Sequence, residues 1–128
     1  MTQTVKAMLG EANRAVAHIA APDVKALIDR GEAVVIDVRE PHEVGMTGKL
    51  PGAMNIPRGL IEFKADSAGP LHDPRLDKDK TIILYCASGG RSALAGKTLK
   101  DFGFEKVFNL GGFKDWAEAG NPVETIQD

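Results

Sequence analysis

The sequence predicts a single α/β domain built on a mostly parallel β-sheet. Its 128 residues are the length of one ordinary domain. Short, nearly continuous apolar runs at residues 33–38 and 81–86 are typical of strands that are covered on both faces. Helical stretches separate such runs, and this alternation of strand and helix indicates parallel strands joined by helices.

The first 20 residues predict an amphipathic helix that precedes the sheet. Between residues 4 and 19, apolar side chains recur three or four positions apart: Val5, Met8, Leu9, Ala12, Val16 and Ile19. This apolar stripe could dock on the domain or on a second subunit, and both alternatives stay open. We therefore divide the chain into an N-terminal amphipathic helix, residues 1–20, and an α/β domain, residues 21–128.

The remaining elements follow from apolar runs and from the positions of proline and glycine. Pro22 suits the first turn of a helix over residues 22–30, which Gly31 ends. Further strands are expected at 54–57 and 106–110, and further helices at 41–46, 58–64, 91–102 and 112–119. The segment 63–80 contains Pro, Gly, Asp and His residues and predicts a long loop, and loops of that length are often functional.

Composition and charge exclude several classes of function. The formal net charge of -2 gives no reason to expect nucleic acid or a membrane as partner. A single cysteine rules out an intramolecular disulfide, and the scattered histidines, with His18 and His42 on expected helices, predict no metal site. No cofactor is expected. Because charged residues interrupt the N-terminal segment and no run could span a membrane, we expect a soluble, cytoplasmic protein whose oligomeric state stays open.

The stretch YCASGGRS, residues 85–92, is the candidate site of chemistry. Cys86 ends the apolar run 81–86, and ligands of open α/β sheets bind at the carboxyl ends of the strands. Gly89 and Gly90 permit backbone angles at which successive N–H groups point at an anion, and the following helix adds its positive N-terminal end. These groups would stabilise a thiolate, and they could then hold an oxyanion or the terminal sulfur of a persulfide.

Two other interpretations of Cys86 stay open at this point. It could be a structural thiol, since free cysteine is among the most buried residue types. It could also be the nucleophile of a cysteine-dependent phosphatase, in which five residues separate cysteine from arginine. Here only the four residues from Ala87 to Gly90 precede Arg91, and this smaller cradle favours a single bound sulfur over a phosphoryl group.

Four motifs in order around this loop resemble the single-domain form of the rhodanese sulfurtransferase family. They are Asp37 to Glu43 (DVREPHE), Gly48 to Pro57 (GKLPGAMNIP), Cys86 to Ser92, and Leu110 to Phe113 (LGGF) with Trp116 and the AGNPV of 119–123. The family often has His-Ile where this chain has Lys-Leu in the second motif. The resemblance runs from about residue 21 to residue 124, so residues 1–20 lie outside it.

The resemblance implies a three-layer rhodanese-like fold, with a mostly parallel central sheet flanked by helices and a persulfide reaction at Cys86. The Cys86 thiolate would take the outer sulfur of a donor such as thiosulfate, become a persulfide, and pass that sulfur to cyanide or a cellular thiol. The substrate would be bound by the loop residues Ala87, Ser88, Gly89, Gly90, Arg91 and Ser92, whose backbone amides would stabilise charge. The partners would be a small sulfur donor and a thiol acceptor, or a protein persulfide.

The alternative within the same family is a non-catalytic binding or regulatory module. Modules of that kind often lack the cysteine, whereas this chain has it. With no second cysteine, a persulfide on Cys86 cannot be resolved as a disulfide within the chain, so its acceptor would come from outside.

The identity of the donor depends on the charges near the loop. Many thiosulfate-using members of the family have a basic residue directly after the cysteine, but here Ala87 and Ser88 are neutral and Arg91 is the only charge. This departure favours a persulfide donor over thiosulfate. Arg58, which follows the 54–57 strand at the same edge of the sheet, could supply the missing positive charge or form an exposed salt bridge.

Residues of the first motif are expected to have structural roles. Asp37 and Arg39 alternate at a strand end, and we expect a charge pair that locks the first loop beside the Cys86 loop. Glu40 and Glu43 fall in the first turn of the helix opened by Pro41, where carboxylates are favoured, and we expect both to be solvated.

The last candidates lie outside these loops. His72 and Asp73, in the long 63–80 segment, could line the mouth of the pocket or take part in proton transfer, or they could simply be solvated. Trp116 is expected in the core. Gly111 and Gly112 are expected to shape the turn from the last strand into its helix.

Overall fold

The structure, a computed structural model that describes residues 2–126, is an α/β domain with a five-stranded sheet. The strands are β1 (Ala17–His18), β2 (Ala33–Asp37), β3 (Met54–Asn55), β4 (Thr81–Cys86) and β5 (Val107–Gly112). Their order across the sheet is β1-β5-β4-β2-β3, and each neighbouring pair is parallel, which confirms the predicted fold class. Residues 1, 127 and 128, at the ends of the two predicted segments, lie outside the described residues.

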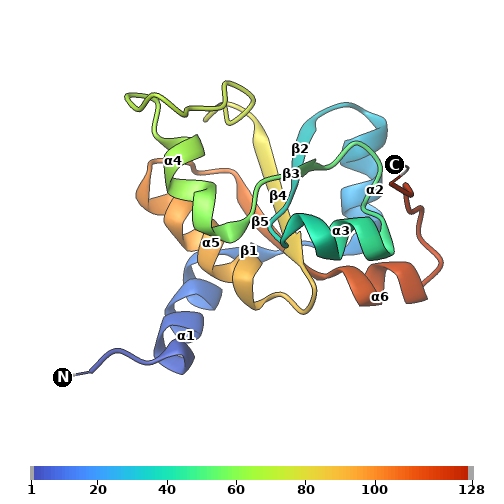
Figure 1. The fold of residues 1–128 in the computed structure, drawn as a ribbon, viewed down its shortest axis with the longest axis horizontal. Coiled ribbons are helices and arrows are strands. Elements are labelled where there is room, and N and C mark those ends of the chain that lie inside the picture. The colour runs from blue at the N-terminus through green and yellow to red at the C-terminus, as the bar shows by residue number, and fades with distance from the viewer. Residues whose placement is uncertain (1, 127–128) are drawn as a thin grey trace.

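Helices cover both faces of this sheet and complete the three layers (Figure 1). Residues of α4 (Ile61–Ala65) and α5 (Gly90–Asp101) pack on one face, and α1 (Val5–Ala15) packs against α5. Residues of α2 (Ala21–Asp29) and α6 (Phe113–Glu118) pack on the other face. The helix α3 (Pro41–Thr47) follows β2, and a short 3-10 helix, η1 (Arg58–Leu60), leads into α4.

The central strand β4 shows why its sequence is apolar at nearly every position. Ile82, Leu84 and Cys86 point to the face that α4 and α5 cover, whereas Ile83 and Tyr85 point to the face that α2 and α6 cover. All five side chains are buried. Each large apolar side chain buried in this way contributes about 1.5–3 kcal/mol, so the strand that delivers Cys86 is firmly anchored.

The N-terminal segment differs from the prediction of one helix over residues 4–19. The helix α1 ends at Ala15, Val16 is extended (φ -116°, ψ 118°), and Ala17 and His18 pair with β5. The side chain of Val16 is buried against Gly96 of α5, where an added Cβ would lie only 2.9 Å from it. Contact with the core thus overrides the helical periodicity, and His18 lies on an edge strand; the boundary between residues 20 and 21 stays a prediction.

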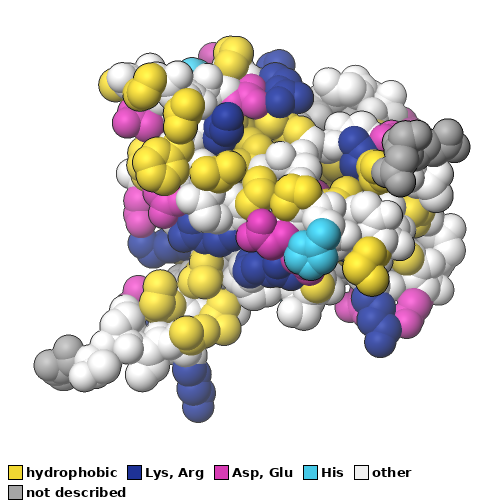
Figure 2. Space-filling view, in the orientation of Figure 1, with side chains coloured by type: hydrophobic (Ala, Val, Ile, Leu, Met, Phe, Trp, Pro, Cys, Tyr) yellow, Lys and Arg dark blue, Asp and Glu magenta, His cyan; other side chains and the backbone are white. Residues whose placement is uncertain are grey.

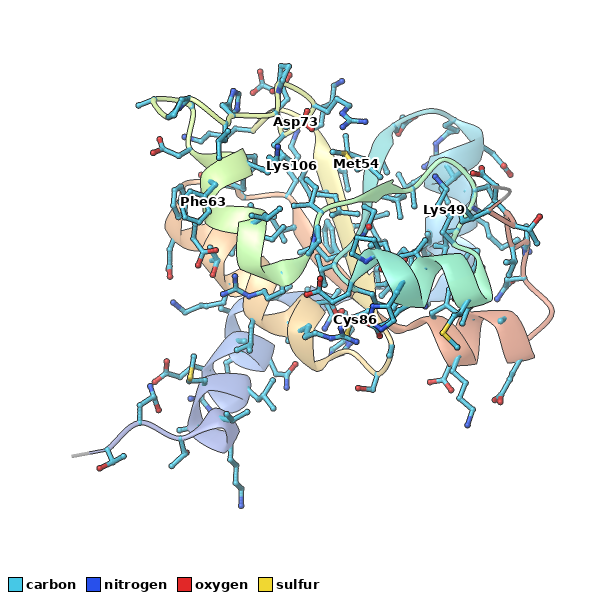
Figure 3. The ribbon with its side chains drawn as sticks, in the orientation of Figure 1. Lys49, Met54, Phe63, Asp73, Cys86 and Lys106 are labelled. Atoms are coloured by element: carbon cyan, nitrogen blue, oxygen red, sulfur yellow. The ribbon has the colours of Figure 1, made fainter. Side chains whose placement is uncertain are left out.

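The two ends of the sheet carry different loops. Figure 3 shows Cys86 at the carboxyl end of the strands and Asp73 and Lys106 at the opposite, amino end. The long loop between α4 and β4, residues 66–80, therefore lies away from Cys86. The predicted strand 54–57 is shorter than expected, since β3 spans Met54–Asn55, although Ile56 still donates its N–H to the carbonyl of Asp37.

Candidate active site at the Cys86 loop

Cys86 is the last residue of β4, and its thiol is enclosed by the loop that follows. The side chain is 1% exposed. The N–H of Gly89 donates to the Cys86 Sγ at 3.0 Å, and the Ser92 Oγ lies 3.5 Å from the same sulfur. Burial alone would raise the pKa of the thiol, but the Ser92 hydroxyl and the N–H groups of Ser92, Gly89 and Ser88 outweigh it and lower the pKa below its ordinary value.

The loop can adopt this shape because of glycines in two segments far apart in the sequence. Gly89 caps α5 with φ +103°, a left-handed conformation that residues with a side chain resist. Gly112, paired with Cys86 across the sheet, has no Cβ; one added there would lie 2.5 Å from the Ala87 carbonyl oxygen. Gly112 thus does more than shape a turn, because it lets the backbone of the Cys86 loop lie directly on β5.

A buried asparagine on β5, which the sequence did not single out, connects these parts. Asn109 is 1% exposed; its Oδ1 accepts from the Ser92 hydroxyl at 2.8 Å and from the Gly111 N–H at 2.9 Å. Its Nδ2 donates to the Gly89 carbonyl at 3.2 Å. One feature of the sequence could have identified Asn109: it is a polar residue two positions after Val107, on the same face of an otherwise apolar strand, and buried polar side chains need hydrogen-bond partners.

Arg91 points to α3, where it forms a two-point ion pair with Glu43. The distances between guanidinium nitrogens and carboxylate oxygens are 2.7 and 2.9 Å. The expectation that Glu43 is merely solvated is therefore wrong, because α3 packs beside the Cys86 loop and brings the two side chains together. The Arg91 hydrogen bonds lower the pKa of Glu43 to about 2, and the same pair raises the pKa of Arg91.

The predicted Asp37–Arg39 charge pair is present and almost completely buried. Three hydrogen bonds join the Arg39 guanidinium to the Asp37 carboxylate at 2.7–3.1 Å, and the side chains are 3% and 0% exposed. Arg39 also donates to the Gly48 carbonyl and lies over the Phe113 ring at 4.5 Å. The pair thus fixes the end of β2 to the C-terminal end of α3, where Arg39 reaches Gly48.

Other predicted side chains have different neighbours. Arg58 donates to Glu62 at 2.9 Å and to Thr98 at 3.1 Å, so it has the salt bridge that was one of its two expected roles. Asp73 pairs with Arg75 at 2.7 Å in the loop at the amino end of the sheet, away from Cys86 in Figure 3. The pocket that His72 lines contains residues of that loop and Phe104. Of the alternatives left open for these two residues, a place at the mouth of the Cys86 pocket is therefore the one that the structure contradicts.

The outer surface of the domain carries mixed charge. Figure 2 shows acidic and basic side chains next to each other on the face in view, with apolar side chains gathered along α1. Exposed apolar residues on α1 include Val5 and Met8.

Within residues 2–126, we find no group of three or more acidic, histidine or cysteine side chains arranged to hold a metal, and no helix with the length and apolarity that a membrane span needs.

Comparison with known proteins places this architecture in a family. The family model of the rhodanese-like domain matches residues 20–119. A sulfurtransferase from Allochromatium vinosum is 34% identical over 98 residues, covering 76% of this chain and 83% of the relative. The chain also matches longer proteins, since it spans 31% of a tRNA uridine(34) hydroxylase from Erwinia tasmaniensis that is 32% identical.

Solved structures agree along nearly the whole chain. A protein of unknown function from Rhodopseudomonas palustris, described as a possible tyrosine phosphatase, is 41% identical with a TM-score of 0.89, covering 97% of this chain and 96% of that one. The polysulfide-sulfur transferase homodimer of Wolinella succinogenes is 30% identical with a TM-score of 0.75, covering 95% and 88%. On the order of its motifs, its parallel sheet and these matches, the chain belongs to the rhodanese-like domain family.

Proposed function

We propose that this chain is a sulfurtransferase that carries a sulfane sulfur as a persulfide on Cys86. The observation that carries the proposal is the hydrogen bond from the Gly89 N–H to the Cys86 Sγ at 3.0 Å, at the carboxyl end of a buried strand. A purely structural thiol needs apolar neighbours and no converging donors. Here the donors lower the pKa of the thiol despite its burial, which supports a thiolate nucleophile.

The proposed reaction has two displacement steps. In the first, the Cys86 thiolate attacks the outer sulfur of a donor R–S–SH; a new S–S bond forms at Cys86, and the donor's S–S bond breaks with its electron pair leaving on R–S⁻. In the second, an acceptor thiolate attacks the outer sulfur of the Cys86 persulfide, and Cys86 leaves as a thiolate. The acceptor comes from outside, since the chain has no second cysteine. The backbone amides of residues 87–92 would stabilise the negative charge at each stage.

The ion pair between Arg91 and Glu43 supports a persulfide or polysulfide donor over thiosulfate. A sulfonate group would need an available positive charge, but the one cation of the loop is already paired with a carboxylate at 2.7 Å. Ala87 and Ser88 add no charge. The similarity to the Wolinella succinogenes polysulfide-sulfur transferase agrees with this choice of donor. We therefore propose an R–S–SH or polysulfide donor and a thiol acceptor.

A cysteine-dependent phosphatase is the second candidate, because the similar Rhodopseudomonas palustris protein is described as a possible tyrosine phosphatase. Two observations count against it. Four residues separate Cys86 from Arg91, which leaves less room than a phosphoryl group needs. Arg91 is also engaged by Glu43 and is not free to clamp a phosphate.

Sulfur loading followed by intact mass tests the proposal. The protein is incubated separately with glutathione persulfide and with thiosulfate, and then with an excess of a thiol. We expect a gain of one sulfur with the persulfide, lost again on addition of the thiol, and no gain in Cys86→Ala. A gain that survives in Cys86→Ala, or no gain with either donor, contradicts the proposal. Hydrolysis of an aryl phosphate that Cys86→Ser abolishes would favour the phosphatase instead.

A further inference from the structure

Asn109 has a place in the fold that its polarity makes costly. It lies in β5 on the same side as Val107, a residue of the cluster that also contains Cys86. It is 1% exposed, and a buried amide lowers stability unless its polar atoms are hydrogen-bonded. Both polar atoms of Asn109 have partners, and all of these partners belong to the segments that surround the sulfur.

The orientation of the Asn109 amide is determined by two backbone groups. The Gly111 N–H can only donate, and it lies 2.9 Å from Oδ1. The Gly89 carbonyl can only accept, and it lies 3.2 Å from Nδ2. A flipped amide would place Nδ2 against the Gly111 N–H, donor against donor, and Oδ1 against the Gly89 carbonyl, acceptor against acceptor. Oδ1 is therefore the atom that faces Ser92. Because Oδ1 only accepts, the Ser92 hydroxyl donates its single proton to it at 2.8 Å.

This arrangement leaves the Ser92 hydroxyl within reach of two acceptors. While the Ser92 hydroxyl donates to Asn109, a lone pair of the Ser92 oxygen faces Cys86. That oxygen can then accept a hydrogen bond from the thiol S–H across 3.5 Å. When the sulfur is ionised, the same hydroxyl can rotate its proton to Sγ without moving its oxygen. Gly89, whose carbonyl Asn109 holds, keeps its N–H on the sulfur at 3.0 Å in either case.

We propose that Asn109 is a positioning residue for Cys86: by holding Gly89 and Ser92, it keeps the Gly89 N–H and the Ser92 hydroxyl within reach of the sulfur as the sulfur changes from thiol to thiolate to persulfide. Only the persulfide stage rests on the proposed function. Asn109 does not touch the reacting sulfur and acts through these two residues.

Few charged groups lie close enough to Cys86 to affect its ionisation alongside the hydrogen bonds from Gly89 and Ser92. Arg91 of α5 faces Cys86 and is paired with Glu43 of α3. The strand β5 has no titratable side chain, and Asp37 at the end of β2 is paired with Arg39. On α5, the remaining charged residues, Lys97, Lys100 and Asp101, lie more than a turn beyond Ser92, and those of α1 (Lys6, Glu11 and Arg14) are exposed. Replacing Asn109 therefore changes the hydrogen bonds around the sulfur and leaves the charged pairs intact.

The rate of Cys86 alkylation by iodoacetamide as a function of pH tests the proposal, because it reports the thiolate and needs no sulfur transfer. In Asn109→Leu the Gly89 carbonyl is no longer held, and we expect the Gly89 N–H to move away from Sγ. The midpoint of the profile should then move up and the rate at pH 7 fall about tenfold, the effect of losing this one hydrogen bond to a charged sulfur. Asn121→Leu is the matched control. Asn121 follows α6, and its side-chain amide also donates to a backbone carbonyl, that of Trp116, at 3.1 Å. Its profile should match that of the wild type.

Asn109→Asp provides a second variant in case the leucine variant does not fold. The aspartate carboxyl still accepts hydrogen bonds from Ser92 and Gly111. Once ionised, however, it places an acceptor oxygen against the Gly89 carbonyl oxygen. It also places a negative charge near the sulfur, separated from it only by the Ser92 hydroxyl. We expect its midpoint to move up further than that of Asn109→Leu. If both variants are folded by circular dichroism and keep the wild-type midpoint, Asn109 only joins β5 to α5 and the proposal is wrong.

A double-mutant comparison tests the route through Ser92. In a Ser92→Ala background, Asn109→Leu should lower the alkylation rate less than it does in the wild type, because only the contact with Gly89 is left to lose. Equal effects in both backgrounds would overturn the role of Ser92. If the midpoint moves as expected while neither donor loads sulfur on the wild type, the proposed function fails and the positioning role stands.

Discussion

The two ends of the parallel sheet both carry loops with glycine and charged residues, yet only the loop at the carboxyl end brings distant segments together around a reactive side chain. At the carboxyl end, the Cys86 loop contacts β5 through Gly112 and α3 through the Arg91–Glu43 pair. At the amino end, the loop of residues 66–80 satisfies its polar groups largely from within, as in the Asp73–Arg75 ion pair and in the Asp77 carboxylate that accepts from the Asp79 N–H.

A functional loop can be distinguished from a merely long one by where its polar groups find their partners. Loop length and composition made both segments candidates, but neighbouring residues can satisfy each other without creating a site. At the carboxyl end, donors of the loop and of α5 converge on one sulfur, and Asn109 of β5 holds them. This requires that residues far apart in the sequence be held at fixed distances. Function in this domain is therefore expected to be sensitive to packing at the carboxyl end and tolerant of change at the amino end.

The largest effect is expected from Gly112→Ala, which would separate the Cys86 loop from β5. The added Cβ would lie 2.5 Å from the Ala87 carbonyl oxygen and 3.2 Å from the Ser88 Cα, and both are backbone atoms that move only with the loop. Displacement of donors by about 1 Å can lower a rate by about a hundredfold, and we expect that loss in persulfide loading of Cys86. Rapid-quench mass analysis measures the loading.

Gly45→Ala is the matched control for this substitution. It adds the same methyl group in α3, where no atom outside the neighbouring residues and backbone of the helix lies within 4 Å of the added Cβ. Its loading rate should equal that of the wild type. If Gly112→Ala also loads at the wild-type rate, the close contact of the loop with β5 does not matter for the reaction.

An intermediate effect is expected from Glu43→Gln, which removes the negative charge beside Arg91. The freed guanidinium could then attract a sulfonate, so loading from thiosulfate should rise about fivefold relative to loading from a persulfide, the scale of a solvent-screened ion pair. Competition between the two donors, read by mass, measures this ratio. An unchanged ratio would mean that the Arg91–Glu43 pair does not determine the choice of donor.

The same variant has a pH signature in stability. Because Arg91 lowers the pKa of Glu43 to about 2, the pair stabilises the fold above the ordinary pKa of a glutamate, and this contribution is lost as pH falls from about 4.5 to about 2. Arg91 is 36% exposed, so screening limits the contribution to about 1 kcal/mol. The melting temperatures of wild type and Glu43→Gln should therefore differ at pH 7 and converge at low pH.

The smallest effect is expected from the amino end of the sheet. His72→Ala and Asp73→Asn change side chains in the loop that Figure 3 places opposite Cys86. We expect persulfide loading within about twofold of the wild type, since both side chains are only partly buried and surface substitutions away from a site change free energies by only about 0.5 kcal/mol. Steady-state transfer to a thiol acceptor measures it. A loss of tenfold or more would show that this loop acts on the site after all.

Much of this architecture could be predicted from local sequence. The apolar runs at 33–38 and 81–86 correspond to strands within one residue, because strands buried on both faces need apolar side chains at successive positions. The Asp37–Arg39 pair and the buried Trp116 followed from residue type and spacing. The end of the first helix could not be predicted in this way, because burial of Val16 against Gly96 depends on α5, some 80 residues later.

The fold class, the position of Cys86 at the end of a strand, and the four-residue spacing to Arg91 follow from the sequence without any knowledge of packing. These are properties of neighbouring residues, and periodicity and motif order express them directly. Three contacts became known from the packed structure: Glu43 pairs with Arg91, Asn109 contacts Gly89 and Ser92, and Gly112 lies against the Cys86 loop. The physical reason is that hydrogen bonds and close contacts act over about 3 Å, so their partners are known only when packing has brought separate segments to that distance.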